Sequence, residues 1–160
     1  MKQPLVLITI LATMLAAGQA QARDTPWYLG IKAGLMDAGP GVTDDAVNAG
    51  FDLGYRHNRY LSTEAELTTT VIDGETRSGR DWEVDTLSGF LALRSNTRVK
   101  LKGKVGISHV DSGGDDDLGL SYGIGIGFPA AGGLTEIEYT TIDYNNEDLD
   151  FFSIGVVFFY

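Results

Sequence analysis

The sequence contains no cysteine, only four prolines and few basic residues. The absence of cysteine excludes a disulfide-stapled scaffold and any zinc or redox site built on thiolates. Twelve Lys and Arg against 22 Asp and Glu give a net charge of −10, which argues against nucleic acid as a partner, because phosphates need a basic surface. A length of 160 residues allows one domain, and 43% hydrophobic residues argue against disorder.

The first 22 residues have the pattern of an export signal. Lys2 gives a positive start, residues 5–17 are apolar, and Ala20-Gln21-Ala22 is a small-x-small cleavage site. The apolar run is shorter than the ~18–20 residues of a spanning helix, so we expect cleavage rather than a membrane anchor. The sequence therefore predicts a signal peptide over 1–22 and one domain over 23–160. No later segment is long and apolar enough to span a membrane as a helix.

The rest of the chain alternates apolar and polar residues with a period of two, which is typical of strands with two unlike faces. The predicted strands cover 27–35, 47–55, 61–69, 82–93, 99–107, 118–128, 135–141 and 152–160. Most have the ~9–11 residues that a tilted strand needs to cross a bilayer, whereas strands of soluble proteins usually have ~5–6. In segment 82–93 apolar residues of both parities occur, and a bulge near 86–89 would reconcile them.

Short and long connections between these strands alternate. The long ones, over 37–46, 72–81, 109–117 and 143–150, are strongly acidic and would all lie at one end. The short ones are basic and carry Arg56, Arg59, Arg94 and Arg98. Short periplasmic turns and longer external loops are typical of outer-membrane barrels. The pattern predicts an all-β fold, an eight-stranded antiparallel up-and-down transmembrane β-barrel, which we expect to be monomeric.

Aromatic residues occur where the predicted strands meet their turns. An aromatic girdle at the short-turn end is predicted from Trp27, Tyr55, Phe128, Phe158 and Tyr160. The last segment alternates up to the final residue, with Phe152, Ile154, Val156, Phe158 and Tyr160 on one face. This indicates a closing strand whose outer face meets lipid and which pairs with the first strand.

Three internal segments and this ending resemble the small eight-stranded outer-membrane barrels, the superfamily of opacity proteins and outer-membrane-protein-A-like barrels. The segments are 61–67 (LSTEAEL), 120–128 (LSYGIGIGF) and 135–140 (TEIEYT). The resemblance implies an outer-membrane location in a Gram-negative bacterium and insertion by the barrel-assembly machinery, which would read the C-terminal signal. The sequence departs from the two-domain members of that group, and we expect no peptidoglycan-binding module in it, so tethering to the cell wall is not carried over.

The face opposite the lipid-facing residues carries charges whose sign alternates between strands. We predict a lumen ion network made of Lys32, Asp52, Glu64, Glu66, Lys100, Lys102, Lys104, Glu136 and Glu138, with glycines making room for the long side chains. Pairing is expected because a lone buried charge costs several kcal/mol. Two alternatives are a narrow water-filled channel and an inverted, soluble barrel with an apolar interior.

Little in the sequence points to catalysis or to a cofactor. The two histidines, His57 and His109, show no triad spacing, so we expect neither a catalytic residue nor a cofactor. The residues Asp111, Asp115, Asp116 and Asp117 form a weak calcium candidate, for which a solvated acidic loop is the simpler interpretation.

These patterns predict a structural or interactive role: envelope integrity, adhesion, or binding of a surface protein through the acidic loops. Outer-membrane lipid and lipopolysaccharide are further expected partners. The alternative is a porin-like channel for small solutes. The sequence does not identify the partner, because binding loops are recognised by shape rather than by motif.

Overall fold

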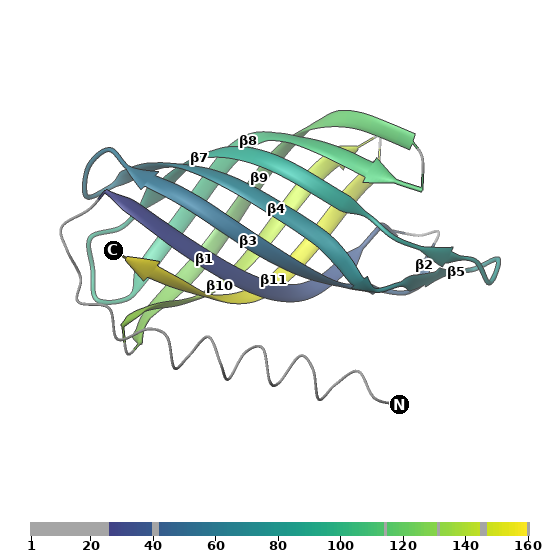
Figure 1. The fold of residues 1–160 in the computed structure, drawn as a ribbon, viewed down its shortest axis with the longest axis horizontal. Helices are drawn as coiled ribbons and strands as arrows, with labels where there is room; N and C mark the ends of the chain where they lie inside the picture. The colour runs from purple at the N-terminus through teal and green to yellow at the C-terminus, as the bar shows by residue number, and fades with distance from the viewer. Residues whose placement is uncertain (1–25, 40–41, 114, 131, 145–146, 160) are drawn as a thin grey trace.

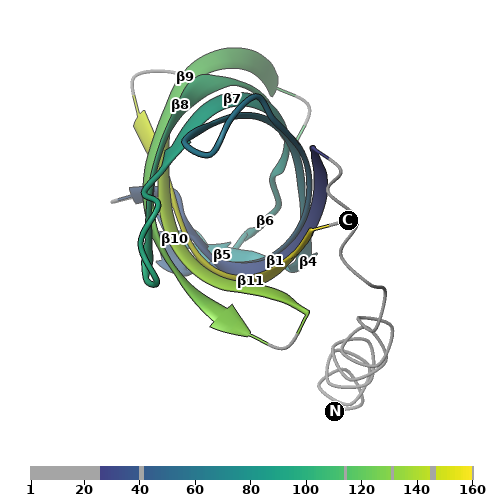
Figure 2. The same ribbon diagram turned by 90° about the vertical axis from the view of Figure 1, so that its left-hand side faces the viewer.

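A computed structural model describes residues 26–39, 42–113, 115–130, 132–144 and 147–159 (Figure 1). Eight of its strands close into one antiparallel barrel in the order β1-β11-β10-β9-β8-β7-β4-β3. Their bounds are β1 Trp27–Asp37, β3 Ala46–Arg56, β4 Leu61–Ile72, β7 Asp85–Arg94, β8 Lys100–Ser112, β9 Asp115–Ala130, β10 Gly133–Tyr144 and β11 Glu147–Phe159. The predicted fold class is confirmed, and the ring of strands is complete in Figure 2. No helix long and apolar enough to span a membrane occurs in the described residues.

The barrel closes where its last strand pairs with its first. Leu29 lies opposite Phe158 and Leu35 lies opposite Phe152, with regular antiparallel pairing between these positions. Because this pairing leaves the barrel no free strand edge, no backbone donors or acceptors of an edge face lipid. The expected pairing of the C-terminal strand with the first strand is confirmed.

The two faces of the sheet have opposite chemistry. Large apolar side chains point outward, and three on β8 and β9 are 61%, 64% and 70% exposed: Leu101, Ile107 and Ile124. Charged residues such as Lys102 and Glu138 are buried inside. An outward apolar band suits lipid, whereas a soluble barrel would turn these residues inward. The inverted alternative is therefore wrong.

Two of the predicted long loops are instead continuations of strands. β8 and β9 remain paired up to Ser112 and Asp115, and β10 and β11 up to Tyr144 and Glu147. The predicted loops 109–117 and 143–150 are thus wrong as loops. Inward residues within them, such as Val110 and Leu149, continue the period of two, and antiparallel ladders persist where that period persists.

The other two predicted loops contain a separate three-stranded sheet. Strands β2 (Val42–Asp44), β5 (Gly74–Thr76) and β6 (Asp81–Trp82) pair in the order β2-β5-β6. This sheet, called here the extension sheet, projects beyond one mouth of the barrel (Figure 1). That mouth is called the extension end, and the opposite mouth, with the short connections, the turn end.

The predicted bulge in the fourth barrel strand does not occur, and that strand begins later than predicted. Trp82 belongs to the extension sheet, and β7 pairs with both of its neighbours without a register shift. Leu87 and Leu91 point outward at 58% and 53% exposure, while Phe90 points inward. The bulge was predicted because apolar residues occur at both odd and even positions and the inner face was assumed to be polar throughout. An inward Phe90 removes the need for it.

Glycine allows the backbone of β8 to approach β7 closely. A Cβ on Gly106 would lie 1.9 Å from the carbonyl oxygen of Gly89, a contact that the backbone cannot relieve without moving. Three residues away on the same strand, a Cβ on Gly103 would meet nothing within 4 Å. The two positions therefore form a matched pair.

We predict that Gly106→Ala lowers the stability of the folded barrel by about 1–3 kcal/mol, because the added methyl overlaps a backbone carbonyl. Urea titration measures this loss, with the folded fraction read on a gel as the band whose mobility changes on boiling. Gly103→Ala is the control and should leave the midpoint unchanged or slightly higher. Equal midpoints for the two variants would contradict the close approach of β7 and β8.

Candidate functional site: a charged lumen between two apolar layers

Charged residues line the middle of the lumen and apolar residues line its ends. Along β1 the inward side chains are Tyr28, Lys32 and Met36, separated by glycines. Strand β10 repeats the order with Leu134 and Ile142 on either side of two glutamates. The interior is therefore layered along the barrel axis.

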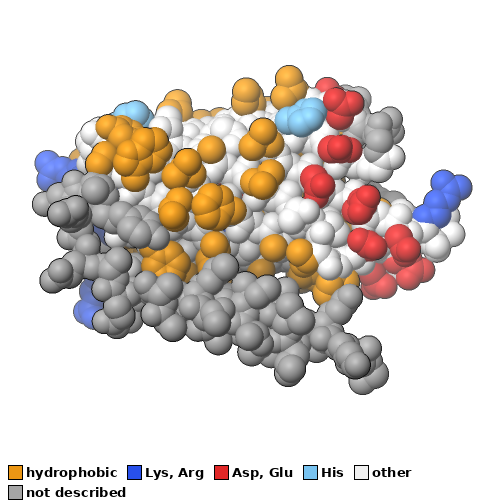
Figure 3. All heavy atoms as spheres, in the orientation of Figure 1, with side chains coloured by type: hydrophobic (Ala, Val, Ile, Leu, Met, Phe, Trp, Pro, Cys, Tyr) orange, Lys and Arg blue, Asp and Glu red, His pale blue; other side chains and the backbone are white. Residues whose placement is uncertain are grey.

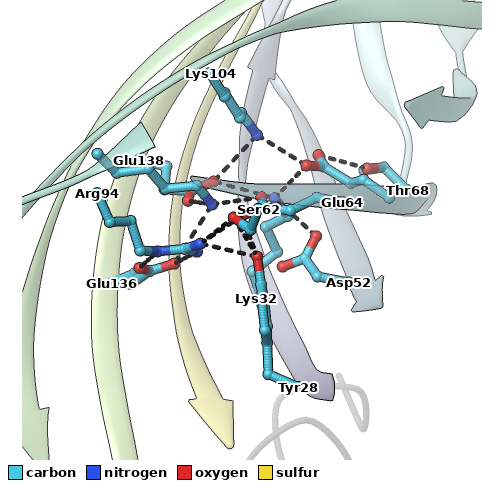
Figure 4. Close-up of polar contacts among 12 residues, drawn as sticks. Tyr28, Lys32, Asp52, Ser62, Glu64, Thr68, Arg94, Lys104, Glu136 and Glu138 are labelled. Atoms are coloured by element: carbon cyan, nitrogen blue, oxygen red, sulfur yellow. Dashed lines mark hydrogen bonds and ion pairs between the residues drawn. The ribbon is translucent and has the colours of Figure 1, made fainter. Parts of the chain in front are cut away.

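The middle layer contains nine charged side chains from six strands, several of which are shown in Figure 4. The cations are Lys32 on β1, Arg94 on β7 and Lys102 and Lys104 on β8; the anions are Asp52 on β3, Glu64 and Glu66 on β4, and Glu136 and Glu138 on β10. This set is called here the lumen network. Each member forms at least one ion pair, so each buried charge has a compensating partner.

Glu138 and Glu66 hold the three lysines together. Glu138 contacts Lys102, lies 3.2 Å from the ammonium of Lys32 and 3.1 Å from that of Lys104. One oxygen of Glu66 lies 2.7 Å from Lys32 and 2.8 Å from Lys104. Since β1, β4, β8 and β10 supply these groups, the ion pairs link opposite walls of the barrel.

Arg94 anchors the part of the network nearest the turn end. Its guanidinium donates to both oxygens of Glu136, at 3.0 and 3.1 Å, and to Glu64 at 2.6 Å. It also donates to the hydroxyl of Tyr28, which in turn donates to Glu64 at 2.5 Å. Bidentate pairing of this kind fixes both partners in geometry as well as in charge.

Arg94, predicted to lie in a basic turn, instead belongs to the lumen network. Its position in the alternation gave a usable signal, because Arg94 shares the inward side of β7 with Phe90 and Ala92.

Lys100 was predicted to belong to the network and does not. It begins β8 at the mouth of the barrel, is half-buried, and forms no ion pair within the described part of the chain. Lys102 and Lys104, further into the same strand, both reach the network.

Small residues give the long side chains room. A Cβ on Gly50 would lie 2.9 Å from Cγ of Lys32, and one on Gly123 would lie 3.0 Å from Cε of Lys104. Above the network the hydroxyl of Ser108 bonds those of Ser88 and Ser121, each at 2.5 Å. The expected use of glycines as space for long side chains therefore has a geometric basis at these two lysines.

The apolar layers at both ends were not predicted. At the extension end six buried side chains form a cluster: Met36, Val84, Val110, Ile142, Leu149 and Phe151. At the turn end Tyr28, Leu134 and Val157 form a smaller one, with Phe159 packed against it. The barrel-strand residues of both clusters alternate in step with the charged residues. The sequence pattern therefore places them on the inner face, which the prediction treats as wholly polar.

The predicted aromatic girdle lies at the turn end, facing outward. Trp27 is 50% and Phe128 is 41% exposed, and the ring of Trp27 meets that of Tyr55 edge-on at 4.9 Å between centroids. Phe158 is half-buried on the same side, and Tyr160 lies outside the described residues. Of the predicted assembly signal, Phe152 and Ile154 are exposed on the outer face, and Val156 and Phe158 follow them along β11.

The calcium candidate is not brought together. Asp111 and Asp116 lie opposite each other in the β8–β9 pair, while Asp117 follows Asp116 and so points to the other face of the strand. The side chain of Asp115 lies outside the described part. Among the described residues no group of three or more acidic or histidine side chains could hold a metal ion.

The two histidines are exposed and lie far apart in the fold. His57 is at the turn end, 3.1 Å from the hydroxyl of Thr63, and His109 lies on the outer side of β8, opposite Leu87 and Leu118. Within the described residues neither ring hydrogen-bonds a carboxylate, so no Ser-His-Asp arrangement forms there.

Comparison with known proteins agrees with this architecture. Residues 7–160 match the outer membrane protein beta-barrel domain, and the chain belongs to that family of Gram-negative outer-membrane proteins. By sequence it matches none of the curated proteins with which it was compared.

Three solved structures share the fold at low identity. Neisserial surface protein A (NspA) is 14% identical, with a TM-score of 0.62 over 85% of this chain and 98% of that one. The attachment invasion locus protein Ail of Yersinia pestis is 16% identical, with a TM-score of 0.58 over 82% and 96%. The outer-membrane enzyme PagL is 11% identical, with a TM-score of 0.56 over 83% and 99%. Because one of the three is an enzyme, the fold alone does not decide between catalysis and binding.

The ion pairs of the lumen lead to a stability test. We predict that Lys102→Met destabilises the folded barrel by about 3–5 kcal/mol, because it leaves Glu64, Glu136 and Glu138 short of a buried cation. The midpoint of urea unfolding in detergent micelles measures the effect.

The control is Lys100→Met, the same change two residues earlier on β8, which should stay within about 0.5 kcal/mol of the parent protein. If both variants lose the same stability, the network does not hold the barrel together.

Proposed function

We propose that the protein is a non-enzymatic surface-interaction barrel with a closed lumen, whose extension end faces the outside of the cell. In this proposal the signal peptide directs export, the barrel-assembly machinery inserts the chain through its C-terminal strand, and the turn end faces the periplasm. The acidic extension end then meets a partner with a basic surface.

The observation that carries this proposal is a set of carboxylates that face one another across strands. In the extension sheet Asp44 lies opposite Glu75, which lies opposite Asp81. At the rim of the barrel Asp85, Asp111 and Asp116 form a second such row. Like charges directly opposite each other destabilise a sheet. A row that costs stability supports a binding role, because a cationic partner would relieve the repulsion.

The negative charge of the extension end also distinguishes this chain from one protein of similar structure. Ail of Yersinia pestis has been crystallised with the heparin analogue sucrose octasulfate. The extension end of this chain carries carboxylates, which gather at one end of the molecule in Figure 3, and these would repel a sulfated sugar. We therefore infer that the partner is cationic.

The lumen supports binding rather than transport. The network residues are nearly fully buried, and an apolar layer lies on each side of them along the axis. A cavity beside Lys32, Asp52 and Glu138 has a volume of about 10 Å³, room for about one water molecule. An interior filled by side chains is also what eight strands favour. A porin-like channel would need a continuous aqueous path through these layers.

We predict that the parent protein gives no steady current in planar bilayers. The double variant Lys102→Ala/Glu138→Ala should conduct, because it removes two long lumen side chains, from the two strands on either side of β9, without changing the net charge. Single-channel recording in concentrated KCl measures both.

The matched control is Leu101→Ala/Ile137→Ala, which shortens the neighbouring side chains on the outer face of the same two strands and should stay silent. Steady currents from the parent protein would overturn the closed lumen and favour the channel.

The surface role predicts a charge-dependent interaction. Bacteria displaying the protein should adhere to a lysozyme-coated surface, and Asp44→Asn/Glu75→Gln/Asp81→Asn should reduce adhesion severalfold at low salt, with little difference at high salt. Arg77→Gln/Arg80→Gln, at the tip of the same sheet, should not reduce it. Adhesion to heparin-coated rather than lysozyme-coated surfaces would contradict the proposal.

A further inference from the structure

The turn end of the barrel is basic, in contrast to the acidic extension end. Arg56, Arg59 and Arg98 are exposed there and Lys100 is half-buried. The described residues of the connections at this end, within 56–61, 94–100 and 129–134, include no aspartate or glutamate. Figure 3 shows basic side chains at the turn end, the acidic side chains gathered at the extension end, where basic ones also lie at the tip, and the apolar band between the two ends.

The cations lie on two turns that are neighbours in space. The β3–β4 turn carries Arg56 and Arg59, and the β7–β8 turn carries Arg98. β4 pairs with β7, and the backbone amide of Arg94 donates to the carbonyl of Tyr60 at 2.7 Å. The basic residues therefore gather on one side of the mouth, whereas the described residues of the β9–β10 connection carry no charge.

Both turns are held in defined conformations. The side-chain oxygen of Asn58 accepts from the amides of Tyr60 and Leu61, at 2.8 and 3.0 Å. The hydroxyl of Ser95 accepts from the amide of Leu101 at 2.9 Å. Arginines on such turns are presented at a nearly fixed depth, which lowers the entropy lost when they bind a ligand.

Along the barrel axis, the arginines of these turns lie at the edge of the apolar band. The guanidinium of Arg59 lies 5.2 Å from the ring centre of Tyr60, an exposed aromatic residue. Leu93 and Leu101, at 60% and 61% exposure, begin the lipid-facing surface next to the β7–β8 turn. A ligand that fits this surface has an acidic head and an apolar tail. A soluble acidic polymer would match the charges but not the adjacent apolar band.

We propose that the turns carrying Arg59 and Arg98 form a binding site for the headgroup of an anionic phospholipid, with its acyl chains along Leu93 and Leu101. Guanidinium groups suit a phosphodiester because they can donate two parallel hydrogen bonds. The inference rests on the turn end facing the phospholipid leaflet, as in the proposed orientation. Its test uses purified protein in vesicles, so it does not depend on the surface partner.

The chain supplies its own reporter for the test. It contains two tryptophans, and Trp27 lies at the turn end whereas Trp82 lies in the extension sheet. In Trp82→Phe, reconstituted with brominated phosphatidylglycerol or brominated phosphatidylcholine at equal mole fractions, quenching of Trp27 reports the relative affinity for each lipid. We expect about fivefold preference for phosphatidylglycerol in low salt, falling toward unity in high salt.

Arg59→Gln/Arg98→Gln in the same background should abolish the preference, and Arg77→Gln/Arg80→Gln, which removes the same charge from the opposite end, should retain it. If Trp82→Phe does not fold, native mass spectrometry of the protein with Trp82 in place measures the same preference, as the relative amount of each lipid that stays bound.

Equal quenching by the two lipids, or a preference unchanged in Arg59→Gln/Arg98→Gln, would overturn the proposal. Arginine-dependent binding to isolated peptidoglycan without lipid preference would overturn it too, and would assign the site to a soluble acidic polymer.

Discussion

The structure depends on mutual compensation of charges that the fold buries. Nine ionic side chains occupy the lumen of a barrel whose outer face is apolar. Water cannot solvate them freely there, and an isolated buried charge costs several kcal/mol. The network is therefore stable only when all the contributing strands are in place. Its ion pairs join β1, β4, β8 and β10 across the lumen and reward complete closure of the barrel.

This constraint explains the order of residues along each strand. Lipid on one side and charges on the other require strict alternation, and a slip of one residue would expose every charge to lipid. The ends of the inner face need no such compensation, so apolar residues such as Met36 and Val157 can close them. Glycines opposite Lys32 and Lys104 supply the remaining space. The same alternation thus sets the register, the packing and the closed interior.

The fold could be predicted because a period of two needs only local sequence. The eight barrel strands and the inward position of Lys32, Lys102 and Glu138 followed from this period together with strand length and the alternation of short and long connections. Closure by the last strand followed from the alternation up to the final residue. Arg94 was missed because basic residues near a turn were assigned to the surface before parity was applied. The continued pairing of β8 with β9 and of β10 with β11 was missed because acidic residues suggest loops, although strands pair through backbone groups regardless of charge. Which cation meets which carboxylate depends on the strand tilt, which no single segment contains.

The coupling between Lys102 and Glu138 tests the central claim most directly. A double-mutant cycle of Lys102→Met and Glu138→Gln, measured as unfolding free energies in micelles, isolates their interaction from the separate cost of each change. A network that closes the barrel predicts a coupling energy of at least about 1.5 kcal/mol, with the double variant more stable than the sum of the single losses implies. Additive losses, within about 0.5 kcal/mol, would contradict it and leave the outer apolar face as the main determinant of the fold.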